Sequence, residues 1–213
     1  MKALSQKIFI IGLPRTATTS ICEAFLQLGY KTAHTAYTKA CFEQATVIAD
    51  TPVFADFKQL DSLYPNAKFI YLDRSLTDWL PSIKQLLLRM EQNITRADGG
   101  FNLHIKRVYQ EIFAPFTLEN IQSDDFLKAC YLRHQKCVFS YFNDRLSDFI
   151  SINISEKESI NTLHQFLGLN IADTQVFQFR PLNIAGKVTA WTDIKHPLKI
   201  ASTRNGKIDK RIY

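Results

Sequence analysis

The sequence has few of the residues that interrupt regular structure and few that build disulfide or zinc frameworks. Its 213 residues include only 7 glycines, 7 prolines and 4 cysteines. No two cysteines form a Cys-x-x-Cys pair, and none has the Cys/His spacing of a zinc site, so a disulfide scaffold and a zinc module are excluded. We expect reduced thiols in the core at Cys22, Cys41, Cys130 and Cys137.

Long hydrophobic runs are also missing. The longest apolar stretch near the N-terminus covers residues 8–13 and is interrupted by Pro14-Arg15. A membrane-spanning helix needs about 20 apolar residues, and the hydrophobic region of a secretory signal is longer than this stretch too. We therefore expect a cytoplasmic protein with no membrane partner.

The composition is that of an ordinary folded domain. Apolar residues make up 46% of the chain and charged residues 22%, which excludes disordered, collagen-like and low-complexity structure. A length of 213 residues predicts a single domain over 1–213.

Positive charge is concentrated in a basic C-terminal segment, residues 187–213. The formal net charge of the chain is +6, and this segment, with seven basic and two acidic residues, carries +5 of it. Such a segment suits an anionic partner. The chain has no RRM, zinc-finger or helix-turn-helix signature, so we expect a phosphorylated small molecule and no nucleic acid.

Strand and helix patterns alternate along the chain. Runs rich in β-branched and aromatic residues at 7–11, 68–72 and 149–154 predict buried strands. After the first of these runs, apolar residues at helical spacing predict a helix from Ile21 to a C-cap at Gly29. The alternation predicts an α/β protein with a central parallel sheet.

Three further helices are predicted after the strand at 68–72. They cover Thr77 towards Met90, residues 101–113 and residues 124–145. We expect Pro81 in the first turn of its helix, where a missing N–H costs least. The segment 155–158 has the pattern of a capping box opening a helix that ends at Gly168.

The loop after the first strand is a candidate anion site. A loop that joins a buried strand to a helix N-terminus offers unpaired backbone N–H groups and the positive end of the helix dipole. Here the loop also carries four hydroxyl side chains and one guanidinium. The predicted anion-binding residues are Arg15, Thr16, Ala17, Thr18, Thr19 and Ser20.

This loop departs from the Walker A pattern. Gly12 fits the first glycine, but Ala17 stands at the second glycine and Thr18 at the lysine. Because that lysine contacts the β- and γ-phosphates of a triphosphate, its absence disfavours kinase and NTPase chemistry. A divergent P-loop kinase or NTPase is the alternative hypothesis.

Two segments resemble the sulfotransferases. Residues 14–20, Pro-Arg-Thr-Ala-Thr-Thr-Ser, are similar to that family's 5′-phosphosulfate-binding loop, in which glycine stands at the position of Ala17. Arg74 at a strand end, with Ser82 eight positions later, resembles the family's 3′-phosphate-binding pair. The resemblance implies the P-loop nucleotide-binding architecture, a three-layer, P-loop NTPase-like fold in which helices flank the central parallel sheet. It also implies 3′-phosphoadenosine 5′-phosphosulfate (PAPS) as donor, without a metal. It also implies transfer of a sulfuryl group to a hydroxyl or amine of a small-molecule or glycan acceptor.

The same resemblance suggests roles for individual residues. Arg15 takes the position that contacts the leaving 5′-phosphate. The segment 202–207, which contains Arg204, is similar to a basic segment that contacts the 3′-phosphate. Acceptor pockets in this family are built from variable loops, so the motifs specify neither the acceptor nor an oligomeric state.

The motifs do not identify a general base, and three candidates stay open. Asp50 is favoured and precedes a possible short strand, Glu43 lies 28 residues after Arg15, and His34 follows the second strand. A carboxylate or an imidazole can each remove the acceptor's proton. Because none is singled out, a catalytically inactive phosphonucleotide-binding protein is a further alternative.

Overall fold

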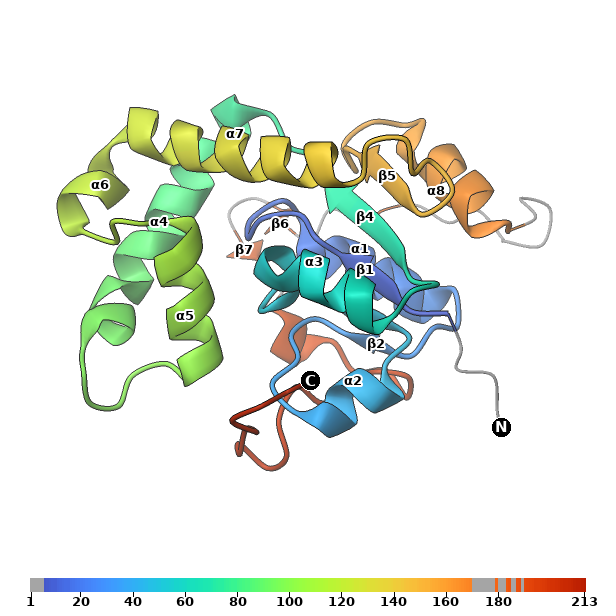
Figure 1. The fold of residues 1–213 in the computed structure, drawn as a ribbon, viewed down its shortest axis with the longest axis horizontal. Helices are drawn as coiled ribbons and strands as arrows, with labels where there is room; N and C mark the ends of the chain where they lie inside the picture. Colours follow the sequence, from blue (N-terminus) through green and yellow to red (C-terminus); the bar gives the residue numbers. More distant parts are fainter. Residues whose placement is uncertain (1–5, 170–178, 180–182, 185–186, 189) are drawn as a thin grey trace.

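A five-stranded parallel sheet forms the centre of the computed structural model, which describes residues 6–169, 179, 183–184, 187–188 and 190–213 (Figure 1). The strand order is β2-β3-β1-β4-β5, and every neighbouring pair is parallel. This confirms the predicted α/β class with a central parallel sheet. The strands are β1 (Ile8–Ile10), β2 (Thr32–Ala33), β3 (Val47–Ala49), β4 (Lys68–Leu72) and β5 (Phe149–Ile152).

Helices connect the strands and cover the sheet. They are α1 (Thr18–Gln27), α2 (Lys39–Gln44), α3 (Val53–Leu63), α4 (Leu76–Thr95), α5 (Leu103–Ile112), α6 (Leu118–Gln122), α7 (Asp124–Tyr141) and α8 (Ser159–Leu167). Near the C-terminus follow a small hairpin, β6 (Asn183–Ile184) with β7 (Lys187–Val188), and the short 3-10 helix η1 (Trp191–Asp193). Within the part of the chain that the structure describes, no helix is both apolar enough and long enough to cross a bilayer.

Alternate residues of the strands face two separate cores. Phe9 and Phe69 pack on one side with α2, α3 and α7, whereas Ile10 and Ile70 pack on the other with α1 and α8. Burial of each such side chain contributes about 1.5–3 kcal/mol to folding. A third core joins α4, α5, α6 and α7, the group of helices beside the sheet in Figure 1. The sheet is thus held between two layers of helices, as the three-layer prediction requires.

The strand predictions are confirmed where the apolar runs are long. The predicted strands at 7–11, 68–72 and 149–154 correspond to β1, β4 and β5. The expectation that Asp50 precedes a short strand is wrong, because β3 ends at Ala49 and Asp50 follows it. This places Asp50 at the carboxyl end of a strand, next to the loop after β1.

The expected helix boundaries are wrong at two places. Ser75 caps α4 by accepting a hydrogen bond from the N–H of Asp78, so the helix begins early and Pro81 lies inside it, beyond the first turn. The segment 155–158 is not a capping box, because α8 begins at Ser159 and has no side-chain cap. Ser159 instead donates its hydroxyl to the carbonyl of Asn153. Gly168 ends α8 in the left-handed conformation, as predicted.

Candidate functional site

The loop from Gly12 to Ala17 leaves the carboxyl end of β1, the central strand of the sheet. In open parallel sheets, ligands bind at this edge, where neighbouring connections turn to opposite sides. A Cβ at Gly12 would lie 2.7 Å from the Cβ of Leu72 and 2.7 Å from Oγ1 of Thr16. Only glycine therefore allows the loop to pass this close to β4.

The backbone of the loop presents several N–H groups at one place. Arg15 has φ 73° and Ala17 φ 72°, both left-handed, and turns of this kind form concave nests that bind anions. Among the described residues, no backbone or side-chain acceptor takes the N–H of Ala17, Thr18 or Thr19. The start of α1 therefore has the unpaired donors that a bound anion requires.

Ala17→Gly is expected to raise the free energy of unfolding by about 0.5–1 kcal/mol. A left-handed residue with a Cβ costs roughly 1–2 kcal/mol, and the greater freedom of glycine in the unfolded chain offsets about 0.5–1 kcal/mol of the gain. Urea denaturation measures the difference. The control, Ala24→Gly inside α1, should lower stability. A loss of stability in Ala17→Gly would contradict the prediction.

The hydroxyl groups of the loop have different orientations. Thr16 is buried and donates its hydroxyl to the carbonyl of Leu13 at 2.7 Å, so it holds the loop together. The N–H of Ser20 donates to the carbonyl of Ala17 at 3.0 Å. Oγ1 of Thr18 and Oγ1 of Thr19 instead lie 3.0 Å and 3.1 Å from Nε2 of His34. Two of the four predicted hydroxyls thus face another polar group of the site.

The two predicted phosphate motifs lie in direct contact. Nη1 of Arg74 donates to the carbonyl of Arg15 at 2.6 Å, and Nε of Arg15 donates to Oγ of Ser82 at 2.8 Å. Behind them, the buried indole of Trp79 donates to the carbonyl of Pro14 at 2.9 Å. Because β1 and β4 are paired and parallel, the segments that follow them meet at one edge of the sheet.

Positive charge without a partner gathers at this contact. Burial, and then the nearby guanidinium groups of Arg89 and Arg74, lower the pKa of Arg15. In the described ranges, none of these three arginines forms an ion pair with a carboxylate. A cluster of cations without ion-pair partners favours an anionic ligand. Arg89 was missed in the sequence, although it lies two helical turns after Ser82 on α4.

A histidine and a carboxylate stand beside the hydroxyls of the loop. Oδ2 of Asp50 accepts a hydrogen bond from Thr18 at 3.2 Å and lies 3.8 Å from Nε2 of His34. Oδ1 accepts from the N–H and the hydroxyl of Thr51 at 2.7 Å and 3.0 Å. Only 15% of the His34 side chain and 13% of the Asp50 side chain are exposed. Both carboxylate oxygens of Asp50 therefore accept hydrogen bonds.

The protonation of His34 follows from its surroundings. Its ring stacks on Trp191, with 5.6 Å between ring centroids. Burial lowers the pKa of His34, the charge of Asp50 acts in the opposite direction, and Lys199 lowers the pKa further. The net direction is downward, so the imidazole is neutral at neutral pH and is able to accept a proton.

Glu43, the third candidate base, lies away from this group. It is exposed on α2, and its carbonyl accepts a hydrogen bond from Nζ of Lys7 at 3.2 Å. Lys7 directly precedes β1, so Glu43 lies near the amino end of the strand whose carboxyl end carries the loop. Of the three candidate bases, the structure brings together His34 and Asp50 but not Glu43.

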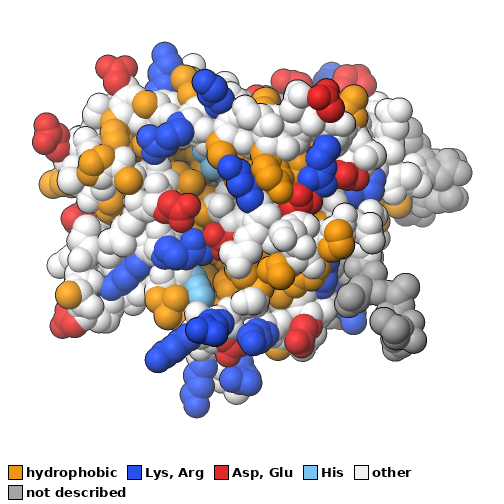
Figure 2. Space-filling view, in the orientation of Figure 1, with side chains coloured by type: hydrophobic (Ala, Val, Ile, Leu, Met, Phe, Trp, Pro, Cys, Tyr) orange, Lys and Arg blue, Asp and Glu red, His pale blue; other side chains and the backbone are white. Residues whose placement is uncertain are grey.

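The basic C-terminal segment packs beside the site. Ser202 accepts hydrogen bonds from the hydroxyl of Thr35, at 2.7 Å, and from the N–H of Tyr37, at 2.9 Å. Figure 2 shows Lys and Arg side chains gathered where this segment lies in Figure 1. Arg204 is exposed and lies 3.7 Å from Asp209. Among the described residues it forms no hydrogen bond or ion pair with the other predicted donor-binding side chains.

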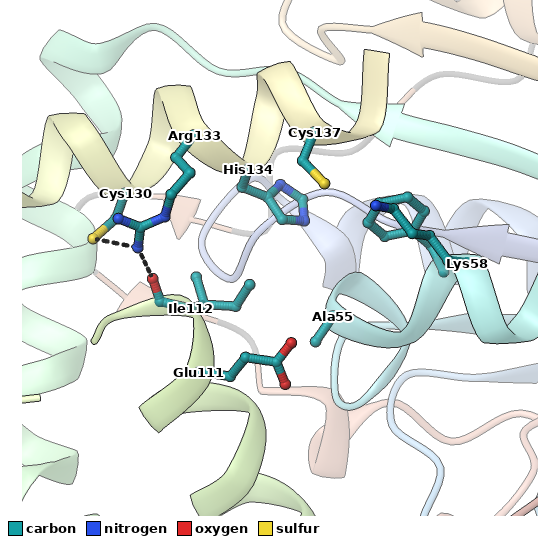
Figure 3. A pocket seen from close by; sticks show the side chains of 9 residues that line it. Ala55, Lys58, Glu111, Ile112, Cys130, Arg133, His134 and Cys137 are labelled. Carbon is teal, nitrogen blue, oxygen red and sulfur yellow. Dashed lines mark hydrogen bonds between the residues drawn. The ribbon is translucent and has the colours of Figure 1, made fainter. Parts of the chain in front are cut away.

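A pocket of about 270 Å³ opens between α3, α5 and α7 (Figure 3). It contains none of the predicted site residues; its lining residues are Ala55, Phe57, Lys58, Glu111, Ile112, Cys130, Arg133, His134 and Cys137.

Cys22, Cys41 and Cys130 are buried thiols, as expected. The core position expected for Cys137 is wrong, because this thiol is exposed on α7.

Comparison with known families identifies the chain. A family model described as a sulfotransferase domain matches residues 7–39 and 35–181. These ranges contain the loop after β1, both residues of the Arg74 and Ser82 pair, and the contact between His34 and Asp50. The comparison with curated proteins found no match. Since the family match covers most of the sequence, this chain belongs to the sulfotransferase domain family.

Proposed function

We propose that this protein transfers a sulfuryl group from PAPS to a hydroxyl or amine of a small-molecule or glycan acceptor. The observation that carries the proposal is the contact of Arg74 with Arg15 and of Arg15 with Ser82. It unites two predicted anion-binding motifs, 59 to 67 residues apart, in one group whose arginines form no ion pair among the described residues. A donor with anionic groups at both its 5′ and 3′ positions fits such a pair.

The residues divide between the two ends of this donor. Unpaired N–H groups at the start of α1 and the guanidinium of Arg15 would hold the 5′-phosphosulfate, and Arg74 with Ser82 would hold the 3′-phosphate. Thr16 supports the loop from inside, and Arg204 stays a prediction for the 3′-phosphate. When bound, the donor supplies the sulfuryl group. The proposed donor-binding residues are Arg15, Thr16, Ala17, Thr18, Thr19, Ser20, Arg74, Ser82 and Arg204.

Transfer also requires a base and a group that stabilises negative charge. Arg15 would stabilise the charge that develops on the departing phosphate, and its hydrogen bond to Ser82 supports this role because it fixes the guanidinium. The neutral imidazole of His34 is the group that accepts the acceptor's proton, at Nε2. The carboxylate of Asp50, with Oδ2 3.8 Å from Nε2 of His34, stabilises the resulting imidazolium. Asp50 and His34 thus act as a pair.

Thermal unfolding with nucleotides tests the donor assignment. Saturating 3′-phosphoadenosine 5′-phosphate (PAP), at about 100 times its Kd, should stabilise the protein by about 2.7 kcal/mol. For a chain of this size, that raises Tm by roughly 5–10 °C. ATP with Mg²⁺ should give a much smaller shift, because the loop lacks the Walker lysine. A larger shift with ATP would support the kinase or NTPase alternative instead.

Labelled donor tests the reaction itself. PAPS labelled at sulfur should transfer its label to at least one member of a panel of phenols, alcohols, amines and oligosaccharides. Tight binding of PAP with no transfer to any acceptor class, and no slow release of labelled sulfate, would support an inactive phosphonucleotide-binding protein.

A further inference from the structure

The corner formed by Asp73 and Arg74, directly after β4, is held by a side chain from a distant helix. Oη of Tyr131, on α7, accepts a hydrogen bond from the N–H of Arg74 at 2.9 Å and lies 3.0 Å from its carbonyl oxygen. The same hydroxyl donates to Oδ1 of Asp73 at 2.5 Å. One phenol thus contacts both peptide groups of Arg74 and the side chain that precedes it.

Asp73 completes a compact network at the end of β4. Its Oδ1 also accepts hydrogen bonds from the N–H of Arg74 at 3.0 Å and from Nε2 of Gln135 at 3.3 Å. Its own N–H donates to the carbonyl of Ile152 at 2.9 Å. The corner is therefore tied to β5 by its backbone and to α7 by two side chains.

Tyr131 is itself held rigidly in a defined protonation state. It is 2% exposed, and its ring packs against Trp79 with 4.7 Å between centroids. Burial, and the hydrogen bond to Asp73, raise the pKa of the phenol, so it stays protonated and keeps donating. Trp79 in turn donates to the carbonyl of Pro14. A single packed group thus contacts both phosphate motifs.

We propose that Tyr131 is a positioning residue that determines how tightly the protein binds a 3′-phosphate, by fixing the backbone of Arg74. The proposal rests on the proposed function, in which Arg74 holds that phosphate. The guanidinium of Arg74 reaches the carbonyl of Arg15 at 2.6 Å, so a small shift of the corner separates it from the loop. A hydrogen bond to a charged group, such as that from Tyr131 to Asp73, is worth about tenfold or more in an equilibrium constant.

The test compares two nucleotides that differ only in the 3′-phosphate. Isothermal titration gives the affinities for PAP and for AMP, in the wild type and in Tyr131→Phe. We expect the variant to lose about tenfold in PAP affinity and less than twofold in AMP affinity. The matched control is Tyr141→Phe on the same helix, which loses a 2.8 Å hydrogen bond to Asp61 instead. It should keep the wild-type ratio of the two affinities.

Each result has a distinct meaning. If the wild type binds PAP no tighter than AMP, the proposed function fails. If the wild type prefers PAP and Tyr131→Phe keeps that preference, or loses both affinities equally, the positioning role is overturned. Should Tyr131→Phe not fold, Gln135→Leu removes the weaker donor to Asp73. It should lower the preference about twofold to threefold, and an unchanged preference there overturns the proposal.

Discussion

Arg15→Ala is expected to lower turnover about a hundred- to a thousandfold while PAP affinity falls much less. Arg15 is the cation nearest the start of α1, and Ser82 fixes its guanidinium at 2.8 Å. A preorganised donor to a developing negative charge contributes about this much to the rate. Alanine adds no backbone cost, because arginine already has a Cβ at this left-handed position. Steady-state kinetics with the acceptor found in the panel, together with titration of PAP, measures both quantities.

Arg74→Ala gives the complementary result. Loss of the Arg74 guanidinium should weaken PAP binding about tenfold to a hundredfold. The value of kcat at saturating donor should stay closer to that of the wild type, since Arg74 binds a group that does not react. Arg96→Ala is a matched control, because Arg96 is exposed and its one ion pair among the described residues is with Asp98. If Arg15→Ala and Arg74→Ala both resemble this control, the two motifs are not the donor site.

His34→Gln is expected to lower turnover about a hundred- to ten-thousandfold, the usual contribution of a general base. In the wild type, the rate should rise with pH as the imidazole loses its proton. Because burial lowers the pKa of His34, the midpoint of this rise should lie below about 6.5, the ordinary value for histidine. A pH profile of kcat for the wild type and the variant measures both effects, and the variant should lack the rise.

Asp50→Asn distinguishes the role of Asp50 from that of His34. The charge of Asp50 raises the pKa of His34, so its removal should move the midpoint to lower pH and reduce the plateau rate. Glu43→Gln, the control, should leave both unchanged, since Glu43 is exposed near the amino end of β1. If Asp50→Asn abolishes turnover while His34→Gln keeps most of it, Asp50 alone is the base.

The fold could be predicted wherever one segment carries enough local signal. The runs at β1 and β4 are buried on both faces, so they read as continuous apolar sequence. β2, with two residues, is too short to show a period. Pro81 was misplaced because a local preference for the first turn is weaker than the cap that Ser75 supplies. The positions of short strands and of helix starts could therefore be established only from the three-dimensional structure.

What the sequence alone determined is a pair of predicted anion-binding motifs. Each is recognisable because an anion at a strand end is bound by consecutive backbone N–H groups and by a few side chains at fixed spacing, all within one stretch of chain. This pattern predicts Arg15, whereas Arg74 and Ser82 are predicted by the resemblance to the sulfotransferases; the structure joins the two segments by hydrogen bonds.

The tertiary structure alone decided which distant groups meet those motifs. His34 follows β2 and Asp50 follows β3, and only the strand order β2-β3-β1-β4-β5 brings them to the loop after β1. In the same way, α7 brings Tyr131 to Arg74 across 57 residues. Contacts of this kind depend on which elements pack together. That packing is set by burial over the whole chain, so no local pattern reports it.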